Sequence, residues 1–360
     1  MPKPLRKLFW WPAVVGILFV GGVAVFSLQR WASSNSSSDD LGRRDRGFYL
    51  AASVKNAALL VKSGADDNLQ LLLIDFQSGR KIRLRSERAH LSSAYLSSDG
   101  ARLLFSRVPL GEQQGYELVS CATDTFSCRS IVKSSGSIHS AFEISNGRFL
   151  YVSSPYFKAY DGRLRLNRND IWMFDPAVGA RQLTDFQLYE LHSLSLGGAS
   201  LYFSALGSPS QKPIIPKQDP SSNRQSSIFQ LPFDAVKGFL SVPSTTLSPS
   251  FEASGIATRP SASADASLVA FLRTRTDIGA YRYDLVVADL KTGAERLITA
   301  PGRGFSRPVV IGDNIYVSFT NGDRVTIRRY GRDEVEMLSV AEIDDASVAS
   351  AEVVDLKIAP

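Results

Sequence analysis

The sequence predicts an all-β fold, a six-bladed β-propeller of four-stranded antiparallel blades that follows one N-terminal transmembrane helix. Three observations lead to this prediction: a long apolar run near the N-terminus, a strand motif that occurs six times, and a hairpin motif that occurs three times. The chain has 360 residues, of which 44% are hydrophobic and 21% are charged. This composition excludes a disordered chain and a protein with many membrane spans.

The apolar run covers residues 9–28 and contains 20 consecutive residues without a charge. A helix needs about 20 residues to cross the hydrocarbon core of a bilayer. Tryptophan rings, which favour the membrane interface, flank the run at Trp10, Trp11 and Trp31. We expect an uncleaved anchor. The alternative is a cleavable signal peptide, because Gly22-Val23-Ala24 has the small-x-small form of a cleavage site.

The organisation of the chain follows from this run. Lys3, Arg6 and Lys7 precede it, and an excess of basic residues marks the cytoplasmic side of a membrane span. We therefore expect an inner-membrane protein with a cytoplasmic N-terminus and a periplasmic folded domain. The expected segments are a cytoplasmic tail (1–8), a transmembrane helix (9–30), a Ser-rich linker (31–47) and a β-propeller domain (48–360).

A repeated strand motif predicts the blades. Each copy joins a tight polar turn to a run of β-branched and aromatic residues, which is typical of a half-buried strand. The copies begin at Lys55, Asp99, Asn146, Gly197, Asp265 and Ile311. A second motif, two strands joined by an Asp-to-Gly turn, has its turns at 75–79, 175–179 and 289–293. Two hairpins per repeat give four antiparallel strands, the content of a propeller blade.

Two of these segments carry a resemblance to a known family. Ser98-Asp99-Gly100, followed by Leu103 and Phe105, and the hairpin over 289–299 resemble the repeats of the TolB-like six-bladed propeller family of the periplasm. The resemblance covers roughly residues 48–345 and implies the fold rather than an activity.

Closure of the ring has two candidate strands. Residues 353–358, VVDLKI, have the composition of a strand, and we expect this strand to pair beside the first blade. Residues 50–53 are the alternative innermost strand of the first blade.

Cys121 and Cys128 flank a six-residue turn between two predicted strands. Opposed residues of antiparallel strands have Cα atoms about 4.5–5.5 Å apart, which suits a disulfide. We expect a structural disulfide, with free thiols or a reactive pair as alternatives. Disulfides persist in oxidising compartments such as the bacterial periplasm.

Charge and motifs argue against nucleic-acid binding and against common catalytic chemistry. The formal net charge is +6, but three basic residues precede the apolar run and the remaining charge is not clustered. The sequence contains no nucleophile elbow, P-loop, metalloprotease or dinucleotide-binding motif. We therefore predict no cofactor and no catalytic residue.

Three histidines are the one constellation that suggests chemistry. His90, His139 and His192 are expected just ahead of the innermost strands of three successive blades, where three imidazoles at one channel mouth would bind a metal. They precede the next turn residue by nine, seven and five positions, so we expect no equivalent positions and no metal site. The alternative function is a periplasmic, lyase-like carbohydrate enzyme with a histidine-bound metal.

Strand order predicts where a partner binds. The connections from the second to the third strand lie at one end of the blades and contain the insertions 107–115, 154–169, 206–226 and 273–281. Long loops on a rigid scaffold commonly carry function, and Arg and Tyr are enriched at interfaces. The predicted partner-binding residues are Arg107, Tyr156, Phe157, Lys158, Tyr160, Arg163, Arg165, Arg168, Lys212, Lys217, Arg224, Arg273, Arg275 and Tyr281. The expected function is a non-catalytic scaffold or accessory subunit that binds the proteins of a larger inner-membrane complex.

Overall fold

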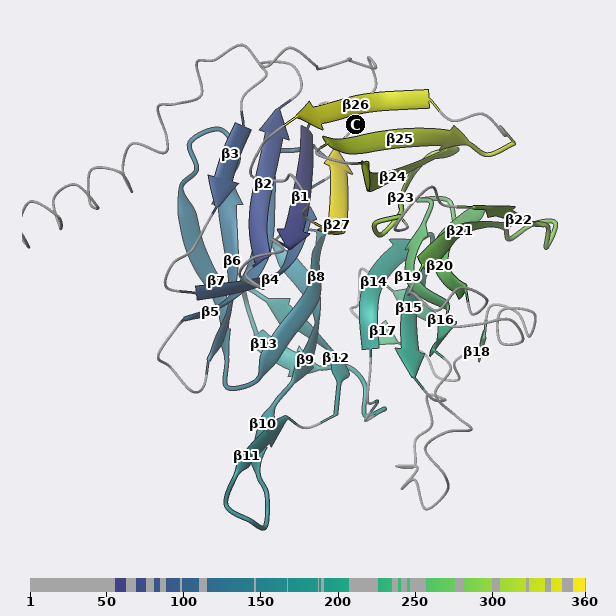
Figure 1. Cartoon of the computed structure of the whole chain (residues 1–360). Helices are drawn as coiled ribbons and strands as arrows, with labels where there is room; N and C mark the ends of the chain where they lie inside the picture. Colours follow the sequence, from purple (N-terminus) through teal and green to yellow (C-terminus); the bar gives the residue numbers. More distant parts are fainter. Residues whose placement is uncertain are drawn as a thin grey trace, which may run out of the picture. The chain divides into compact units, whose positions relative to one another are not determined.

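The structure is a computed structural model of the chain (Figure 1). It describes residues 56–62, 69–75, 81–84, 89–97, 99–109, 115–145, 147–166, 168–186, 188, 191–206, 226–234, 239–240, 245–246, 257–275, 282–299, 305–321, 324–333, 338–344 and 352–359.

The chain divides into two compact units, Met1–Arg46 and Gly47–Pro360. All described residues belong to the second unit. The predicted tail, transmembrane helix and linker therefore lie outside the described residues, together with Trp10, Trp11 and Trp31. In the described part of the chain, no helix is long and apolar enough to cross a membrane.

Five antiparallel sheets have four strands each. In the order of hydrogen-bonded neighbours they are β27 (Glu352–Ala359), β1 (Asn56–Lys62), β2 (Leu69–Asp75) and β3 (Lys81–Leu84); β4 (Ala89–Leu96), β5 (Arg102–Pro109), β6 (Tyr116–Ala122) and β7 (Cys128–Ser134); β8 (Ser137–Ser145), β9 (Arg148–Ser154), β12 (Asp170–Asp175) and β13 (Gly179–Gln182); β19 (Ala257–Ala262), β20 (Leu268–Arg275), β21 (Arg282–Asp289) and β22 (Glu295–Ile298); and β23 (Val309–Ile311), β24 (Asn314–Asn321), β25 (Arg324–Gly331) and β26 (Leu338–Asp344). Each of these sheets has the make-up predicted for a blade.

The prediction of six four-stranded blades is corrected by the β14–β18 sheet, which has five strands: β14 (Leu191–Gly197), β15 (Ser200–Leu206), β16 (Ser226–Asp234), β17 (Phe239–Leu240) and β18 (Thr245–Thr246). Both β17 and β18 pair with β16. Pro243 lies between these two short strands in the sequence. Because proline has no N–H to donate to a ladder, one continuous outer strand is disfavoured there.

The repeated motifs form equivalent elements. The six copies of the strand motif form β1, β5, β9, β15, β20 and β24, and each pairs with the first strand of its sheet. The three copies of the hairpin motif form β2–β3, β12–β13 and β21–β22. The repeat prediction is therefore confirmed at both motifs.

The C-terminal strand completes the first sheet. β27 pairs with β1 in antiparallel register from Asn56 opposite Ala359 to Lys62 opposite Glu352. This confirms the predicted pairing of the C-terminal strand with the first repeat. The alternative strand, residues 50–53, lies outside the described residues.

Buried hydrophobic clusters join sheets that follow one another in the chain. One cluster combines Leu150 and Ile171 of the β8–β13 sheet with Leu201 and Phe229 of the β14–β18 sheet. A second combines Tyr202 of that sheet with Phe271 of the β19–β22 sheet. Burial of large apolar side chains stabilises each by about 1.5–3 kcal/mol, so packing between sheets is the main stabilising contribution to this fold.

The predicted disulfide is present. Cys121 and Cys128 are bonded, with their Cα atoms 4.0 Å apart, and they face each other across β6 and β7. The turn between them holds Phe126 in a left-handed conformation (φ 55°). Phe126 packs against the cluster that contains Leu71 and Leu103, so the disulfide loop is part of the contact between two sheets.

Candidate docking surface

The long connections leave the same end of their sheets. They join β5 to β6, β9 to β12, β15 to β16 and β20 to β21, in each case the second strand to the third along the chain order of the motifs. The connection between β9 and β12 is described over 155–166 and 168–169. It contains a two-stranded hairpin of β10 (Tyr156–Lys158) and β11 (Leu164–Leu166). Figure 1 shows this hairpin beyond the end of the β8–β13 sheet.

The tip of the hairpin is a tight, hydrogen-bonded turn. The N–H of Ala159 donates to the carbonyl of Arg163 (2.8 Å), and the N–H of Gly162 donates to the carbonyl of Ala159 (2.9 Å). Gly162 has φ +76°, as expected for a three-residue hairpin loop that ends on a left-handed residue. The Asp161 carboxylate accepts the N–H of Arg163 (3.1 Å). The sequence Tyr-Asp-Gly therefore fixes the turn locally.

The base of the hairpin is fixed to neighbouring elements. Tyr116, at the start of β6 in the preceding sheet, donates a side-chain hydrogen bond to Tyr156 of β10. Burial, and then the proximity of Tyr156, raises the pKa of Tyr116. Gly136 lies so close to the backbone of Ser154 and Pro155 that a Cβ at position 136 would be 2.7 Å from the carbonyl carbon of Ser154. A glycine is therefore required where the chain enters the hairpin.

Exposed side chains gather at the hairpin tip. Tyr160 is fully exposed, and Lys158, Asp161 and Arg163 are exposed as well. The hairpin therefore presents an aromatic ring, two cations and one carboxylate to solvent.

Two other predicted docking cations are held within their own sheets. Arg107 donates to Glu117 from Nε (2.9 Å) and Nη2 (2.7 Å), and this hydrogen bonding holds the pKa of Glu117 below its usual value. Arg273 pairs with Glu295 at 3.3 Å. A carboxylate partner reduces the charge that either arginine presents to another protein.

The remaining predicted partner residues have little described structure. Arg168 is partly exposed beside the Asn169–Leu188 bridge. The backbone register places Phe157 opposite Arg165 in the hairpin, and Arg275 opposite Arg282 at the end of β20. The predicted residues outside the described part of the chain are Lys212, Lys217, Arg224 and Tyr281.

The histidine prediction is corrected in two respects. His90, His139 and His192 lie within β4, β8 and β14, rather than ahead of these strands. His139 and His192 also occupy equivalent positions, because each directly precedes a shift in the ladder with the second strand. The spacing to the turn differs because β8 has a second register shift between Glu143 and Ser145.

The described histidine side chain is engaged in a hydrogen bond. His139 Nε2 lies 3.1 Å from Oδ1 of Asn169. Among the described residues, no group of three or more His, Cys, Asp or Glu side chains is placed to hold a metal ion.

Sequence reasoning missed a chain of serine contacts between the first strands of successive sheets. Ser140 Oγ accepts the N–H of Ser193 (2.7 Å), and Ser195 Oγ accepts the N–H of Ala262 (3.0 Å). Ser261 Oγ accepts the N–H of Val310 (3.0 Å). Three of these strands have a left-handed residue at the register shift, namely Ser140, Ser193 and Arg259, with φ between 53° and 61°. Such bulges turn backbone groups out of the sheet ladder and toward the next sheet.

Arg307 crosses this inner region. It is 8% exposed, and its Nη2 donates to the carbonyl of Leu194 in β14 (2.8 Å) and to the carbonyl of Pro260 in β19 (3.3 Å). Both carbonyls belong to residues that the register shifts leave out of the ladder. The recurring Arg-Pro pair, at 259–260 and 307–308, was the available sequence signal.

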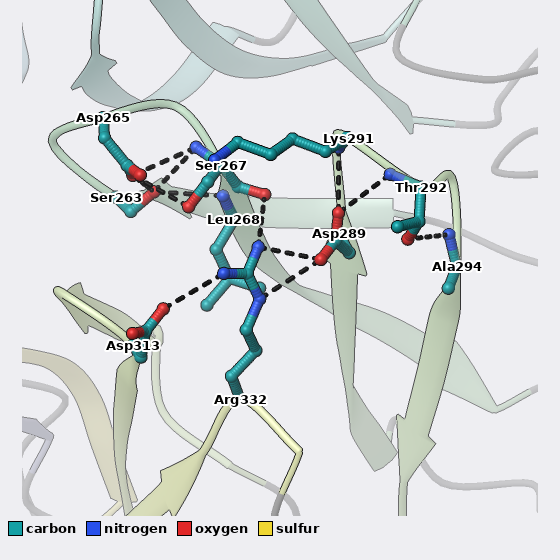
Figure 2. Close-up of polar contacts among 10 residues, drawn as sticks. All are labelled: Ser263, Asp265, Ser267, Leu268, Asp289, Lys291, Thr292, Ala294, Asp313 and Arg332. Carbon is teal, nitrogen blue, oxygen red and sulfur yellow. Dashed lines mark hydrogen bonds and ion pairs between the residues drawn. The ribbon is translucent and has the colours of Figure 1, made fainter.

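At the opposite end of the sheets, an arginine holds two neighbouring sheets together (Figure 2). Arg332, directly after β25, donates to Oδ2 of Asp289 from Nε (3.1 Å) and Nη2 (2.8 Å). It also donates to Asp313 (3.2 Å) and to the carbonyl of Ser267 (3.3 Å). Backbone N–H donation from Thr292 and Lys291, followed by the charge of Arg332, holds the pKa of Asp289 below its usual value. This cluster is a structural contact between turns.

Comparison with known proteins gives a fold. No protein-family model matches the sequence, and no curated protein is similar to it. TolB from Acinetobacter baumannii is similar in structure, with a TM-score of 0.60 and 13% identity over 85% of this chain and 67% of that chain. A putative TolB from Agrobacterium tumefaciens has a TM-score of 0.47 and 12% identity over 86% of this chain and 100% of that chain.

Enzymes occur among the similar structures as well. The acylaminoacyl peptidase of Pyrococcus horikoshii has a TM-score of 0.45 and 12% identity, over 82% of this chain and 46% of that chain. At such identities a structural likeness bears on fold and not on activity. The chain is therefore an all-β propeller with a fold similar to that of TolB.

Proposed function

We propose that this protein is a non-catalytic propeller scaffold, tethered to the inner membrane with its folded domain in the periplasm, that serves as an accessory subunit of a membrane complex. In this proposal the β14–β18 sheet acts as the irregular sixth blade of a ring with the five regular sheets. The residues 9–30 supply the tether.

One observation carries the proposal: the insertions of the repeat are concentrated at one end of the sheets, and the described insertion is an ordered hairpin with exposed aromatic and basic side chains. A propeller that only needed stability would keep these connections short, because short turns join the remaining strands. Ordered insertions on a rigid framework are typical of binding surfaces.

The inner region gives weaker support to the alternative enzyme. A ligand in the channel needs polar groups that converge on free space. In the described inner strands, the serine hydroxyls and the Arg307 guanidinium instead bind backbone groups of neighbouring sheets. His139 is directed to Asn169. These groups are occupied in holding the sheets together.

The proposed compartment rests on the disulfide and on the sequence of the tether. The Cys121–Cys128 bond is of the kind that persists in an oxidising compartment. The basic residues ahead of the apolar run favour a cytoplasmic N-terminus.

Purification of the full chain in a mild detergent, with a tag at the N-terminus, tests the proposal. We expect a fixed set of membrane proteins to co-purify in constant ratio with this chain at moderate salt. A chain that elutes alone would contradict the scaffold function. Intact mass spectrometry tests the tether in the same preparation, since a mature chain that begins at residue 25 or later would contradict an uncleaved anchor.

A further inference from the structure

The β10–β11 hairpin combines the features of a binding hot spot in one small element. We infer that this hairpin is the primary docking element of the propeller, and that it inserts Tyr160 into a pocket on an acidic protein surface. The inference rests on the proposed scaffold function and specifies its contact residues and the chemistry of the partner.

The first argument is rigidity. The turn is fixed by the Ala159–Arg163 and Gly162–Ala159 backbone hydrogen bonds and by the Asp161 carboxylate. The base is fixed by the Tyr116–Tyr156 hydrogen bond. An element that is already ordered loses little conformational entropy on binding, which leaves more of the contact energy for affinity.

The second argument is the exposed aromatic ring. The described residues include three exposed large hydrophobic side chains, namely Tyr160, Val178 and Leu297. Only Tyr160 among these three combines full exposure with an insertion beyond the end of its sheet. Tyrosine at the tip of a rigid element is the residue type that fills a partner pocket at an interface centre.

The third argument is charge. Residues 154–169 contain four basic residues, Lys158, Arg163, Arg165 and Arg168, against the single acid Asp161. Cations around an aromatic anchor favour a partner with negative potential and accelerate association. Asp161 is adjacent to Tyr160 at the tip, so burial of the tip among anionic lipid headgroups would bring like charges together. A protein surface with an acidic rim around a pocket accommodates both the ring and this carboxylate.

A photo-crosslinking experiment on the full chain in its native membranes tests the inference. The probe is p-benzoylphenylalanine in place of Tyr160, and the matched control places it at Val178. Val178 is 79% exposed, and it lies in the β12–β13 turn at the opposite end of the same sheet. We expect position 160 to give one protein adduct, with the crosslink in a segment rich in Asp and Glu, and position 178 to give none. A lipid adduct or no adduct at position 160, or the same protein adduct at both positions, would overturn the inference.

Charge-reversal variants separate this inference from the scaffold function. Lys158→Glu with Arg163→Glu is expected to lower both the adduct yield and the co-purified partner at least tenfold. Arg129→Glu, an exposed arginine on β7, is the control and should change neither by more than twofold. If the partner co-purifies equally with the double variant, the hairpin is not the docking element while the scaffold function stands. If the wild-type chain has no partner at all, the scaffold function itself fails.

Discussion

Replacement of Arg307 by methionine tests how the sheets are joined. Methionine has a similar length and fits a buried site, but it cannot donate to the carbonyls of Leu194 and Pro260. These carbonyls lie at register shifts, so they would lose a charged donor and gain no ladder partner. We expect a marked loss of stability with little change in strand content.

The magnitude follows from the two hydrogen bonds. A hydrogen bond from a charged donor contributes about 1.5–3 kcal/mol. The second bond is long, at 3.3 Å, and the variant no longer buries a charge, which offsets part of the loss. We therefore expect a net loss of about 3 kcal/mol, which corresponds to a fall of about 6–12 °C in Tm for a domain of this size.

Thermal unfolding of the full chain in detergent, followed by circular dichroism at 218 nm, measures this effect. Arg129→Met, at an exposed position on β7, is the control and should leave Tm unchanged within about 1 °C. Arg307→Lys retains one donor and is expected to fall between the wild type and Arg307→Met. If Arg307→Met melts within about 2 °C of the wild type, the reasoning about the inner strands is wrong.

Four further predictions follow from the described contacts. Deletion of residues 347–360 removes β27 from the first sheet and should lower Tm by many degrees, whereas an unchanged Tm would refute the role of this strand. The double variant Cys121→Ser, Cys128→Ser should lose about 2–3 kcal/mol in urea unfolding, and the wild type should show no free thiol to Ellman's reagent before reduction. Gly136→Ala should displace Ser154 and Pro155 and increase proteolysis at the hairpin, an effect that an intact hairpin in limited trypsinolysis would disprove. Hydrogen bonds from Ser97 and from Arg107 lower the folded pKa of Asp99 and Glu117, so their stabilisation is complete above the ordinary carboxyl pKa near 4 and is lost as pH falls below it; urea unfolding between pH 7 and pH 2 should show this loss, and Glu117→Gln should reduce it.

The strands and their pairing order could be predicted from the sequence because their signals are local. Alternation of apolar residues and tight Asp-Gly turns indicate a hairpin without reference to the rest of the chain. The disulfide was predictable for the same reason, since Cys121 and Cys128 flank one turn. The irregular β17 and β18 were missed because a broken outer strand leaves only two residues in each piece, which is too short for a periodic pattern.

The docking surface was partly predictable. Its location followed from strand order, because second-to-third connections must leave the same end of antiparallel sheets. The pairing of Arg107 with Glu117 was not foreseen, since a sequence motif does not show which acid lies across the ladder. The hairpin itself was also missed, because the segments around Tyr156 and Leu164 have only three paired residues each.

The sequence by itself determined the all-β class, the repeated hairpins, the disulfide and the position of the insertions, since each depends on residues close together in the chain. The tertiary structure alone decided which groups meet in the inner strands. Arg307 and Leu194 are separated by 113 residues, and His139 and His192 are equivalent only when the register shifts are counted. The physical reason is that bulges redirect backbone groups by a residue at a time, and their contacts exist only once the hydrophobic faces of successive sheets have packed together.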